Sequence, residues 1–504
     1  TFAARAGATD ADKLLDFIEW QLYPNPADDA DYLARRAAAG FVTLGKSLPQ
    51  WWTDHVRNAT GSNGSNLRFQ PARETRADTL LRGVYSQWQL AEVLTHFWHN
   101  HFSVYAWDTA IAPVWAHYDR DVIRANLFGN FRVFLEAVAK SPAMLLFLDN
   151  FLNQDGGPNE NYARELFELH TLGAENYLGA ALQQPEVPGF PSPIGYVDAD
   201  VYEATRCFTG WRYHDGQSGD SVNDGTFFYY DAWHDRFQKR ILGYEIPANQ
   251  APEYDGQKVL DLLADHPGVA RFISRKLCRR LVSDTPSDAL VAGAAQVFAA
   301  ARSAPDQLRQ VVRHILRSDD FRAAWGQKLK TPAEAALSLL RATRAEYQPN
   351  AAQEFTVTDP LWSRYDAMGQ PLFGRRSPDG YPDTRDAWIG TTSLLFRWRL
   401  CNDLLEDRLK TTINGAPALH TRADVGAQTP AGLTTPSALL DFWVARLFGP
   451  GFSLPAVSRE ELLKLLSGSY PNPPAETPLT APQIADRVKR MVALLVMGPD
   501  FQWR

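Results

Sequence analysis

The sequence predicts a mainly α-helical protein: one large multi-helix unit with a small β insertion and long irregular loops. Three observations support this fold class. Apolar side chains recur at helical spacing along most of the 504 residues. Strand-like alternation is confined to a short region near residues 212–246. Stretches rich in Gly, Pro and Asn separate the periodic segments, as expected for loops between helices.

Helical periodicity divides the chain into three groups of expected helices. In the first part we expect Asp10–Leu22, Asp31–Leu44, Arg76–Phe102, Trp115–Leu127 and Phe131–Leu148. The middle part adds Ala199–Phe208, Gly256–Ala264, His266–Val282, Ser287–Ala300, Pro305–Leu316 and Pro332–Ala345. The last part adds Trp388–Asp407, Pro436–Leu447, Arg459–Leu466 and Ala481–Met497.

The remaining segments are predicted to be strands or loops. Gly225–Tyr230 and Arg240–Ile246, flanked by Asp- and Gly-rich turns, predict one hairpin or small sheet. Asn58–Asn66 and Gln183–Pro193 read as loops. Gln348–Tyr381 is a much longer loop with few helix signals, and loops of this length in compact proteins are usually functional.

We therefore expect three parts. Residues 1–347 would form a helical core that carries the β insertion near 212–246. Residues 348–387 would form the long irregular loop, and residues 388–504 a carboxyl-terminal helical part packed on the core.

Composition excludes several classes of protein. A net charge of -7 and a pI near 5.9 argue against nucleic acid or an anionic membrane as the main partner. No run of 18 apolar residues predicts a transmembrane segment. The three cysteines lie far apart, so they predict buried thiols and neither a disulfide framework nor a thiolate metal site.

The stretch Asn159–Gly173 is the most informative for function. Wound as a helix, it has an apolar face and a polar face, the latter formed by Asn161, Arg164, Glu165 and Glu168. Gly173 stands where a helix C-cap favours a left-handed residue. Such a polar group suits acid–base chemistry or the binding of a polar ligand. The alternative is an ordinary solvated helix face with an i, i+4 ion pair.

Together with Phe97–Phe102, this stretch resembles the large bacterial family of domain of unknown function 1800. Further matching stretches are Ser141–Met144, Arg206–Trp211, His234-Asp235, Leu242-Gly243, His266-Pro267, Arg271–Leu277, Lys328–Pro332 and Gly369–Leu372. They follow the family's usual order over nearly the whole chain. His96 and His99 lie outside the family's pattern, whereas Asn100 and His101 belong to it.

The resemblance implies a setting and leaves the reaction open. Members of the family are usually exported, and their genes often lie beside those of a second exported family similar to sulfatases and alkaline phosphatases. We therefore expect a periplasmic or extracellular protein, with a phosphatase- or sulfatase-like neighbour as a possible partner. The chain opens without a basic-then-apolar leader, so a signal peptide would already be absent from this numbering.

The histidines in and beside the two stretches Phe97–Phe102 and Asn159–Gly173 fall on different faces of their predicted helices. His101, and likewise His170, lies on the apolar side of its helix, so both are expected to be buried. His101 would either join two helices through one hydrogen bond or belong to a site. Glu92, His96 and His99 share the opposite face, which we expect to be solvated, although the same three residue types suit a metal site.

Carboxylate geometry and the richness in Trp, Tyr and Phe favour an enzyme that cleaves a carbohydrate polymer or glycoconjugate by acid–base hydrolysis or elimination, and the resemblance implies that it is exported. Glu168 should raise the pKa of Glu165 and Arg164 should lower it. The two glutamates are too close to flank a glycosidic bond, so a distant partner is needed. The expected catalytic residues are Glu165, Glu168, His101 and Asp235. The expected substrate-binding residues are Asn100, Glu160, Asn161, Arg164, Arg206, Trp211, His234 and Trp98.

Two other readings stay open. One is a metal- or cofactor-dependent helical bundle in which His101, His170, Glu165 and Glu168 are ligands, although the Glu-x-x-His spacing of such proteins is missing. The other is a non-catalytic envelope protein that binds a glycan or a partner protein. The preferred reading requires no cofactor and no metal.

Overall fold

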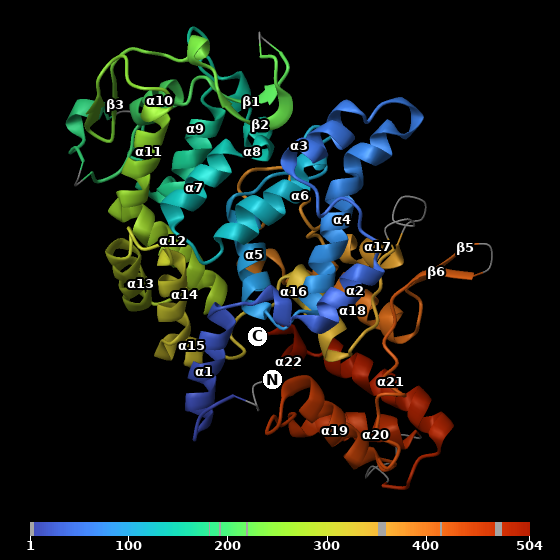
Figure 1. Cartoon of the computed structure of the whole chain (residues 1–504). Helices are drawn as coiled ribbons and strands as arrows, with labels where there is room; N and C mark the ends of the chain where they lie inside the picture. The colour runs from blue at the N-terminus through green and yellow to red at the C-terminus, as the bar shows by residue number, and fades with distance from the viewer. Residues whose placement is uncertain are drawn as a thin grey trace.

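The computed structural model describes residues 5–180, 182–190, 193–217, 220–350, 359–413, 416–468 and 476–504. The mainly α-helical class is confirmed. Figure 1 places the hairpins of the β insertion at one end of the molecule and the carboxyl-terminal helices at the other. No helix in the described part of the chain is long and apolar enough to cross a bilayer.

The amino-terminal helices are α1 Asp10–Leu22, α2 Ala30–Ala38, α3 Leu48–Trp51, α4 Gly64–Tyr85, α5 Gln89–His101, α6 Trp115–His117, α7 Phe131–Lys140, α8 Pro142–Phe147 and α9 Asn161–Glu165. π-helical segments continue three of them: Trp52–Arg57 after α3, Tyr118–Arg124 after α6 and Leu166–Thr171 after α9. The prediction that Asn159–Gly173 is a regular α-helix is therefore wrong for its second half, which is π-helical. Gly173 does have the positive φ that was predicted, +83°.

The middle helices are α10 Asp198–Cys207, α11 Tyr254–Asp265, α12 Pro267–Leu281, α13 Asp288–Ala300, α14 Gln307–Leu316, α15 Asp319–Ala323 and α16 Pro332–Ala342. The last are α17 Pro360–Ala367, α18 Thr391–Leu405, α19 Pro436–Phe448, α20 Ala456–Ser467, α21 Ala481–Met497 and α22 Pro499–Gln502. Most of these agree with the predicted helices to within a few residues.

The predicted helix Arg76–Phe102 is two helices, because the chain turns at Ser86. The Ser86 backbone is extended, and the buried carboxylate of Asp29 accepts hydrogen bonds from the Ser86 hydroxyl and the Gln87 backbone N–H. Ser86 in turn accepts from the Trp88 N–H. Partners from a distant loop thus satisfy the backbone donors that the break exposes.

A second predicted helix, Phe131–Leu148, is also divided. Ser141 has extended backbone dihedrals and its hydroxyl accepts from the N–H of Ala143, while Pro142 occupies the first helical position. A serine cap followed by proline is a helix-start signal that overrides continuous apolar spacing.

The β insertion contains two hairpins, and the predicted pairing of Gly225–Tyr230 with Arg240–Ile246 is wrong. β1 Trp211–Asp215 pairs antiparallel with β2 Asn223–Tyr229, and β3 Lys239–Ile241 pairs with β4 Tyr244–Ile246. Leu242 and Gly243 both have positive φ and form the two-residue turn inside the segment predicted as one strand. A third hairpin, β5 Lys410–Ile413 with β6 Ala416–His420, was not predicted.

The predicted loops are partly confirmed. Asn58–Asn66 runs into α4, which begins at Gly64. In the 348–387 stretch the structure adds α17, and residues 351–358 lie outside the described part, as do residues 191 and 192 of the second loop. One contiguous hydrophobic core includes residues from Ile18 to Phe501, so helices from both ends of the chain share it.

Candidate functional site

A cavity of about 260 Å³ lies where α5, α12, α16, α17 and the loop after α17 meet. The carboxyl-terminal half of α5 supplies one wall and α12 supplies another. The loop 370–383 closes a third side. Four of the stretches that carry the family resemblance therefore meet here: Phe97–Phe102, Arg271–Leu277, Lys328–Pro332 and Gly369–Leu372.

The cavity wall is chemically mixed. Its aromatic members are Phe97, Tyr365, Phe373 and Tyr381. Its polar and ionisable members are His96, His99, Asn100, His101, Ser103, Lys276, Arg279, Arg280, Thr331, Gln370, Arg375, Asp379, Tyr381 and Asp383. Apolar ring faces beside convergent hydrogen-bonding groups are what a pocket for a polar organic molecule requires.

Asn100 attaches the loop to α5. Its amide donates to the carbonyl oxygen of Tyr381 and accepts from the backbone N–H of Tyr381, so one side chain replaces a pair of backbone hydrogen bonds. Gly380 has φ +71°, and a Cβ there would lie 2.1 Å from the Asn100 carbonyl oxygen. Only glycine allows this approach. Asn100 was predicted to bind substrate; in the structure it lines the cavity and holds the loop that forms one wall.

His99 is held by a carboxylate from the segment after α6. Its Nε2 lies 2.8 Å from an Asp119 oxygen, and Arg124 donates to the other Asp119 oxygen and to both oxygens of Glu92. Burial alone would raise the pKa of Asp119, but Arg124 and His99 hold it well below its usual range. Because Asp119 is ionised, it orients His99 with the proton on Nε2.

The predicted solvated face of Glu92, His96 and His99 is therefore wrong. Glu92 is buried and paired with Arg124, and the His99 side chain is 6% exposed. Burial and the nearby Arg280 lower the pKa of His96 to about 3. Packing of α5 against the segment after α6 buries Glu92 and His99, which helical spacing alone cannot reveal, and His96 is half-buried in the cavity wall.

His101 and His170 are both buried, as predicted. His101 Nε2 lies 3.1 Å from the backbone carbonyl oxygen of His170, so it joins α5 to the π segment by one hydrogen bond. Since a carbonyl only accepts, Nε2 carries the proton and Nδ1 is left as an acceptor. His101 Nδ1 has no hydrogen-bond partner among the described protein atoms, and His101 lines the cavity.

Glu165 is half-buried at the junction between α9 and the π segment. Burial raises its pKa, Glu168 raises it further, and Arg164 lowers it, so the expected influence of both neighbours is confirmed. Asp379, a residue of the cavity wall, also raises the pKa of Glu165. Neither Glu165 nor Glu168 is among the residues that line the cavity.

The rest of the predicted polar stripe makes ion pairs. Arg164 pairs with Glu160 at 3.3 Å and with Asp198 of α10 at 3.6 Å. Asn161 is half-buried at the start of α9, with its backbone N–H bound to Asn159. Of these contacts, the Arg164–Asp198 pair attaches α9 to α10.

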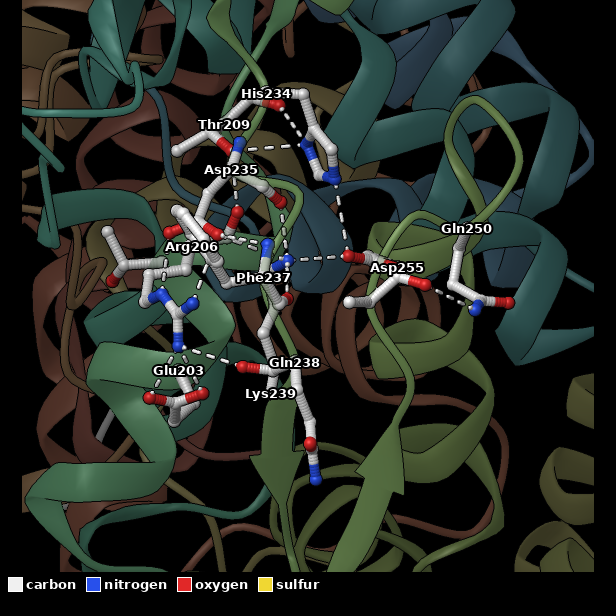
Figure 2. A network of polar contacts seen from close by, with 12 residues as sticks. Glu203, Arg206, Thr209, His234, Asp235, Phe237, Gln238, Lys239, Gln250 and Asp255 are labelled. Atoms are coloured by element: carbon white, nitrogen blue, oxygen red, sulfur yellow. Dashed lines mark hydrogen bonds and ion pairs between the residues drawn. The ribbon is translucent and has the colours of Figure 1, made fainter.

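Arg206, His234 and Asp235 belong to a separate polar network (Figure 2). Two nitrogens of Arg206 donate to the two oxygens of Asp235, at 2.7 and 3.0 Å, and a third donates to Glu203. Lys239 donates to Asp255 at 2.8 Å, and His234 Nε2 lies 3.2 Å from the same carboxylate. The network joins α10, β3 and α11 near the base of the hairpins.

The environment of Asp235 favours a structural role over acid–base chemistry. Burial alone would raise the pKa of Asp235, but Arg206 and Lys239 lower it overall. Trp211 and Trp98 are 0% and 1% exposed, so neither presents a ring face to solvent for stacking on a substrate. Both tryptophans belong to the hydrophobic core. A high aromatic content in the sequence does not show which tryptophans pack in the core and which bind a ligand.

Among the described residues, no group of three or more His, Cys, Asp or Glu side chains is arranged to hold a metal ion. No such cluster therefore supports the alternative in which a metal is bound by His101, His170, Glu165 and Glu168. Cys207, Cys278 and Cys401 are free and buried, as predicted.

Sequence reasoning missed the basic wall of the cavity. Arg280 is buried and pairs with Glu334 of α16 at 3.1 Å and with Asp383 at 3.4 Å. Arg504 contacts the same Glu334 at 2.9 Å. The available signal was the density of basic residues within 267–281, three of which fall inside the stretch Arg271–Leu277.

Comparison with known proteins decides the family. The family described as Protein of unknown function (DUF1800) matches residues 1–503. This chain belongs to that family. No curated protein and no solved structure matches it. Membership gives no reaction, so function must be argued from the cavity and the groups around it.

Proposed function

We propose that this family member is an exported enzyme that cleaves a polysaccharide or glycoconjugate by carboxylate acid–base chemistry. The observation that carries the proposal is the environment of Glu165, which does not itself line the cavity but lies within electrostatic reach of its wall. Glu165 is a half-buried carboxyl group with a raised pKa, and a residue of the cavity wall, Asp379, contributes to that shift. A carboxyl group of this kind keeps its proton longer than a surface glutamate and suits general acid catalysis.

The roles follow from the chemistry of a glycosidic bond. Glu165 gives its proton to the leaving oxygen as the carbon–oxygen bond breaks. In hydrolysis a water then attacks the anomeric carbon and loses a proton to a base. His101 is the candidate base, because its Nδ1 is an acceptor without a protein partner and His101 lines the cavity. Glu168 and Arg164 adjust the pKa of Glu165, and Asn100 shapes the pocket.

The aromatic residues of the cavity would bind the sugar. Phe373 and Tyr381 lie on the loop, and Phe97 and Tyr365 lie on α5 and α17. Sugar rings have apolar faces that stack on aromatic rings, while their hydroxyl groups need acceptors such as His101 Nδ1. This composition supports a carbohydrate over an entirely apolar ligand.

One observation favours a second candidate function. Because Arg164 is engaged by Glu160 and Asp198, the polar stripe could serve only to attach α9 to α10. The chain would then bind a glycan, or its phosphatase-like neighbour, in the envelope without cleaving anything. Periplasmic or extracellular localisation belongs to both proposals.

The test is a screen of purified protein against a broad polysaccharide panel, with reducing ends and unsaturated products as separate readouts. Release of reducing ends alone indicates hydrolysis, and absorbance from a new carbon–carbon double bond indicates elimination. Binding without any product supports the second candidate. If no member of the panel is cleaved or bound, both candidate functions are contradicted.

A further inference from the structure

The basic residues of α12 differ in whether they have carboxylate partners. Three are paired: Arg271 with Asp288, Arg275 with Glu175, and Arg280 with Glu334 and Asp383. Lys276 and Arg279 are not paired, because no carboxylate oxygen among the described residues lies within 4 Å of their nitrogens. The Nε of Arg279 donates only to a backbone carbonyl, that of Asp284.

Both unpaired cations line the cavity, one helical turn apart. Placing two like charges side by side in a partly desolvated wall is unfavourable without an anion between them. The effect is visible on Lys276: burial, with Arg279 adding to it, lowers its pKa to about 8. At neutral pH the ammonium group is still mostly protonated, so the wall presents positive charge.

The charge of the whole lining leads to the same conclusion. Lys276, Arg279, Arg280 and Arg375 face Asp379 and Asp383, which is four cations against two carboxylates, a balance of +2. The whole chain has a net charge of -7. Of the two carboxylates, Asp379 pairs with Arg375 at 2.7 Å and Asp383 pairs with Arg280 and Lys328. Both carboxylates raise the pKa of Lys276 from a distance, but neither forms an ion pair with Lys276 or Arg279.

We propose that this cavity binds an acidic sugar, with Lys276 and Arg279 pairing the carboxylate or sulfate group that the sugar carries. The inference rests on the proposed function, since it names the substrate class for the same cavity. Lysine and arginine are the side chains that bind such oxyanions most strongly, and the ring faces and polar side chains that share the cavity wall suit the rest of a sugar ring.

The experiment measures binding by calorimetry, so that turnover is not required. The probes are a uronate oligosaccharide, a sulfated disaccharide, a neutral oligosaccharide of equal length and inorganic sulfate. The variant is Lys276→Met, which removes the charge and keeps most of the chain length. The matched control is Lys258→Met on α11, because Lys258 is also half-buried, with its Nζ 4.4 Å from the Tyr244 ring, and lies outside the cavity.

We expect an acidic sugar to bind the parent protein at least tenfold more tightly than the neutral one. Lys276→Met should weaken that binding by about 10- to 100-fold, the loss of one charged hydrogen bond, and Lys258→Met should leave it unchanged. Which of the two acidic probes binds, the uronate oligosaccharide or the sulfated disaccharide, shows whether the cavity prefers a carboxylate or a sulfate ester. Four results would each overturn the inference. They are equal affinity for acidic and neutral sugars, unchanged affinity of Lys276→Met for the acidic sugar, no binding of either acidic sugar, and inorganic sulfate binding as tightly as the sugars.

A second measurement uses the unmodified chain and does not depend on how the variant folds. Acetylation of Lys276 as a function of pH, read by peptide mass spectrometry, should reach its midpoint near pH 8. Bound acidic sugar should shift that midpoint upward and leave Lys258 unaffected, whereas an unshifted midpoint contradicts the pairing. Acidic-sugar binding without cleavage would refute the proposed function alone, and cleavage of neutral glycans only would refute this inference alone.

Discussion

The side-chain amide of Asn100 forms both a donor and an acceptor hydrogen bond with the backbone of Tyr381, which lies 281 positions further along the chain. This contact attaches the 370–383 loop to the carboxyl-terminal end of α5. It gives the cavity a fixed wall and places Tyr381 and Asp379 beside the helix that carries His99 and His101.

Asn100→Ala should therefore destabilise the fold and loosen the loop. Two hydrogen bonds are lost and the Tyr381 backbone groups lose their partners, so we expect a loss of about 1–3 kcal/mol in the free energy of unfolding. Hydrogen exchange should accelerate within residues 370–383. Asn126→Ala is the control, since the Asn126 amide makes only one bond, to Val122 within its own helical turn. Equal effects of the two variants would contradict the account.

His101 and His170 should differ in their tolerance of leucine. His101→Leu leaves the buried His170 carbonyl without its partner, at a cost of about 1–3 kcal/mol. The His170 ring has no hydrogen-bond partner among the described protein atoms, so His170→Leu should cost less. Chemical denaturation of both variants checks the order, and a reversed order would show that the His170 ring has a partner.

His170 should also make stability depend on pH. Burial, with Lys276 adding to it, lowers its pKa to about 3. In the unfolded chain an ordinary histidine binds a proton below about pH 6.5, while the native ring stays neutral, so stability falls as pH decreases from about 6.5 towards 3. His170→Leu should reduce the slope between pH 7 and 5, by at most about 1.4 kcal/mol per pH unit. An unchanged slope would mean that His170 is not buried as the neutral ring.

Asp235→Asn should affect stability rather than catalysis. The substitution leaves the half-buried Arg206 with Glu203 as its remaining counter-charge, so we expect a loss of less than the roughly 3–5 kcal/mol that breaking a fully buried pair costs. Asp231→Asn is the matched control, because Asp231 pairs with Arg236 at an exposed position. If Asp235→Asn instead removes activity while the thermal midpoint stays within a degree or two of that of Asp231→Asn, Asp235 has a chemical role.

Local periodicity predicted most helices, and it failed where distant contacts decide the backbone. The break at Ser86 depends on Asp29, 57 positions away, and the helical spacing across it is uninterrupted. The hairpin error has a different cause: Leu242 adopts a positive φ that leucine rarely takes, stabilised by hydrogen bonds to Asp200 and Phe190. No property of Leu242 alone predicts that turn.

The candidate site was predictable only in part. Helical phasing placed His101 and His170 in the interior, and their contact across two segments follows from burial. The same phasing placed His99 on a solvated face, because it could not anticipate that Asp119 and Arg124 pack there. Lys276 and Arg279 look like members of an ordinary basic helix until the carboxylate partners of their neighbours are known.

The most direct test of the proposed function is the turnover of Glu165→Gln on whichever glycan the panel identifies. The substitution preserves shape and most hydrogen bonding and removes the titration. If Glu165 is the acid or base, turnover should fall by about 10²–10⁴ with thermal stability nearly unchanged. Turnover within a few-fold of the parent protein would contradict the account and move the chemistry to another group, first to His101.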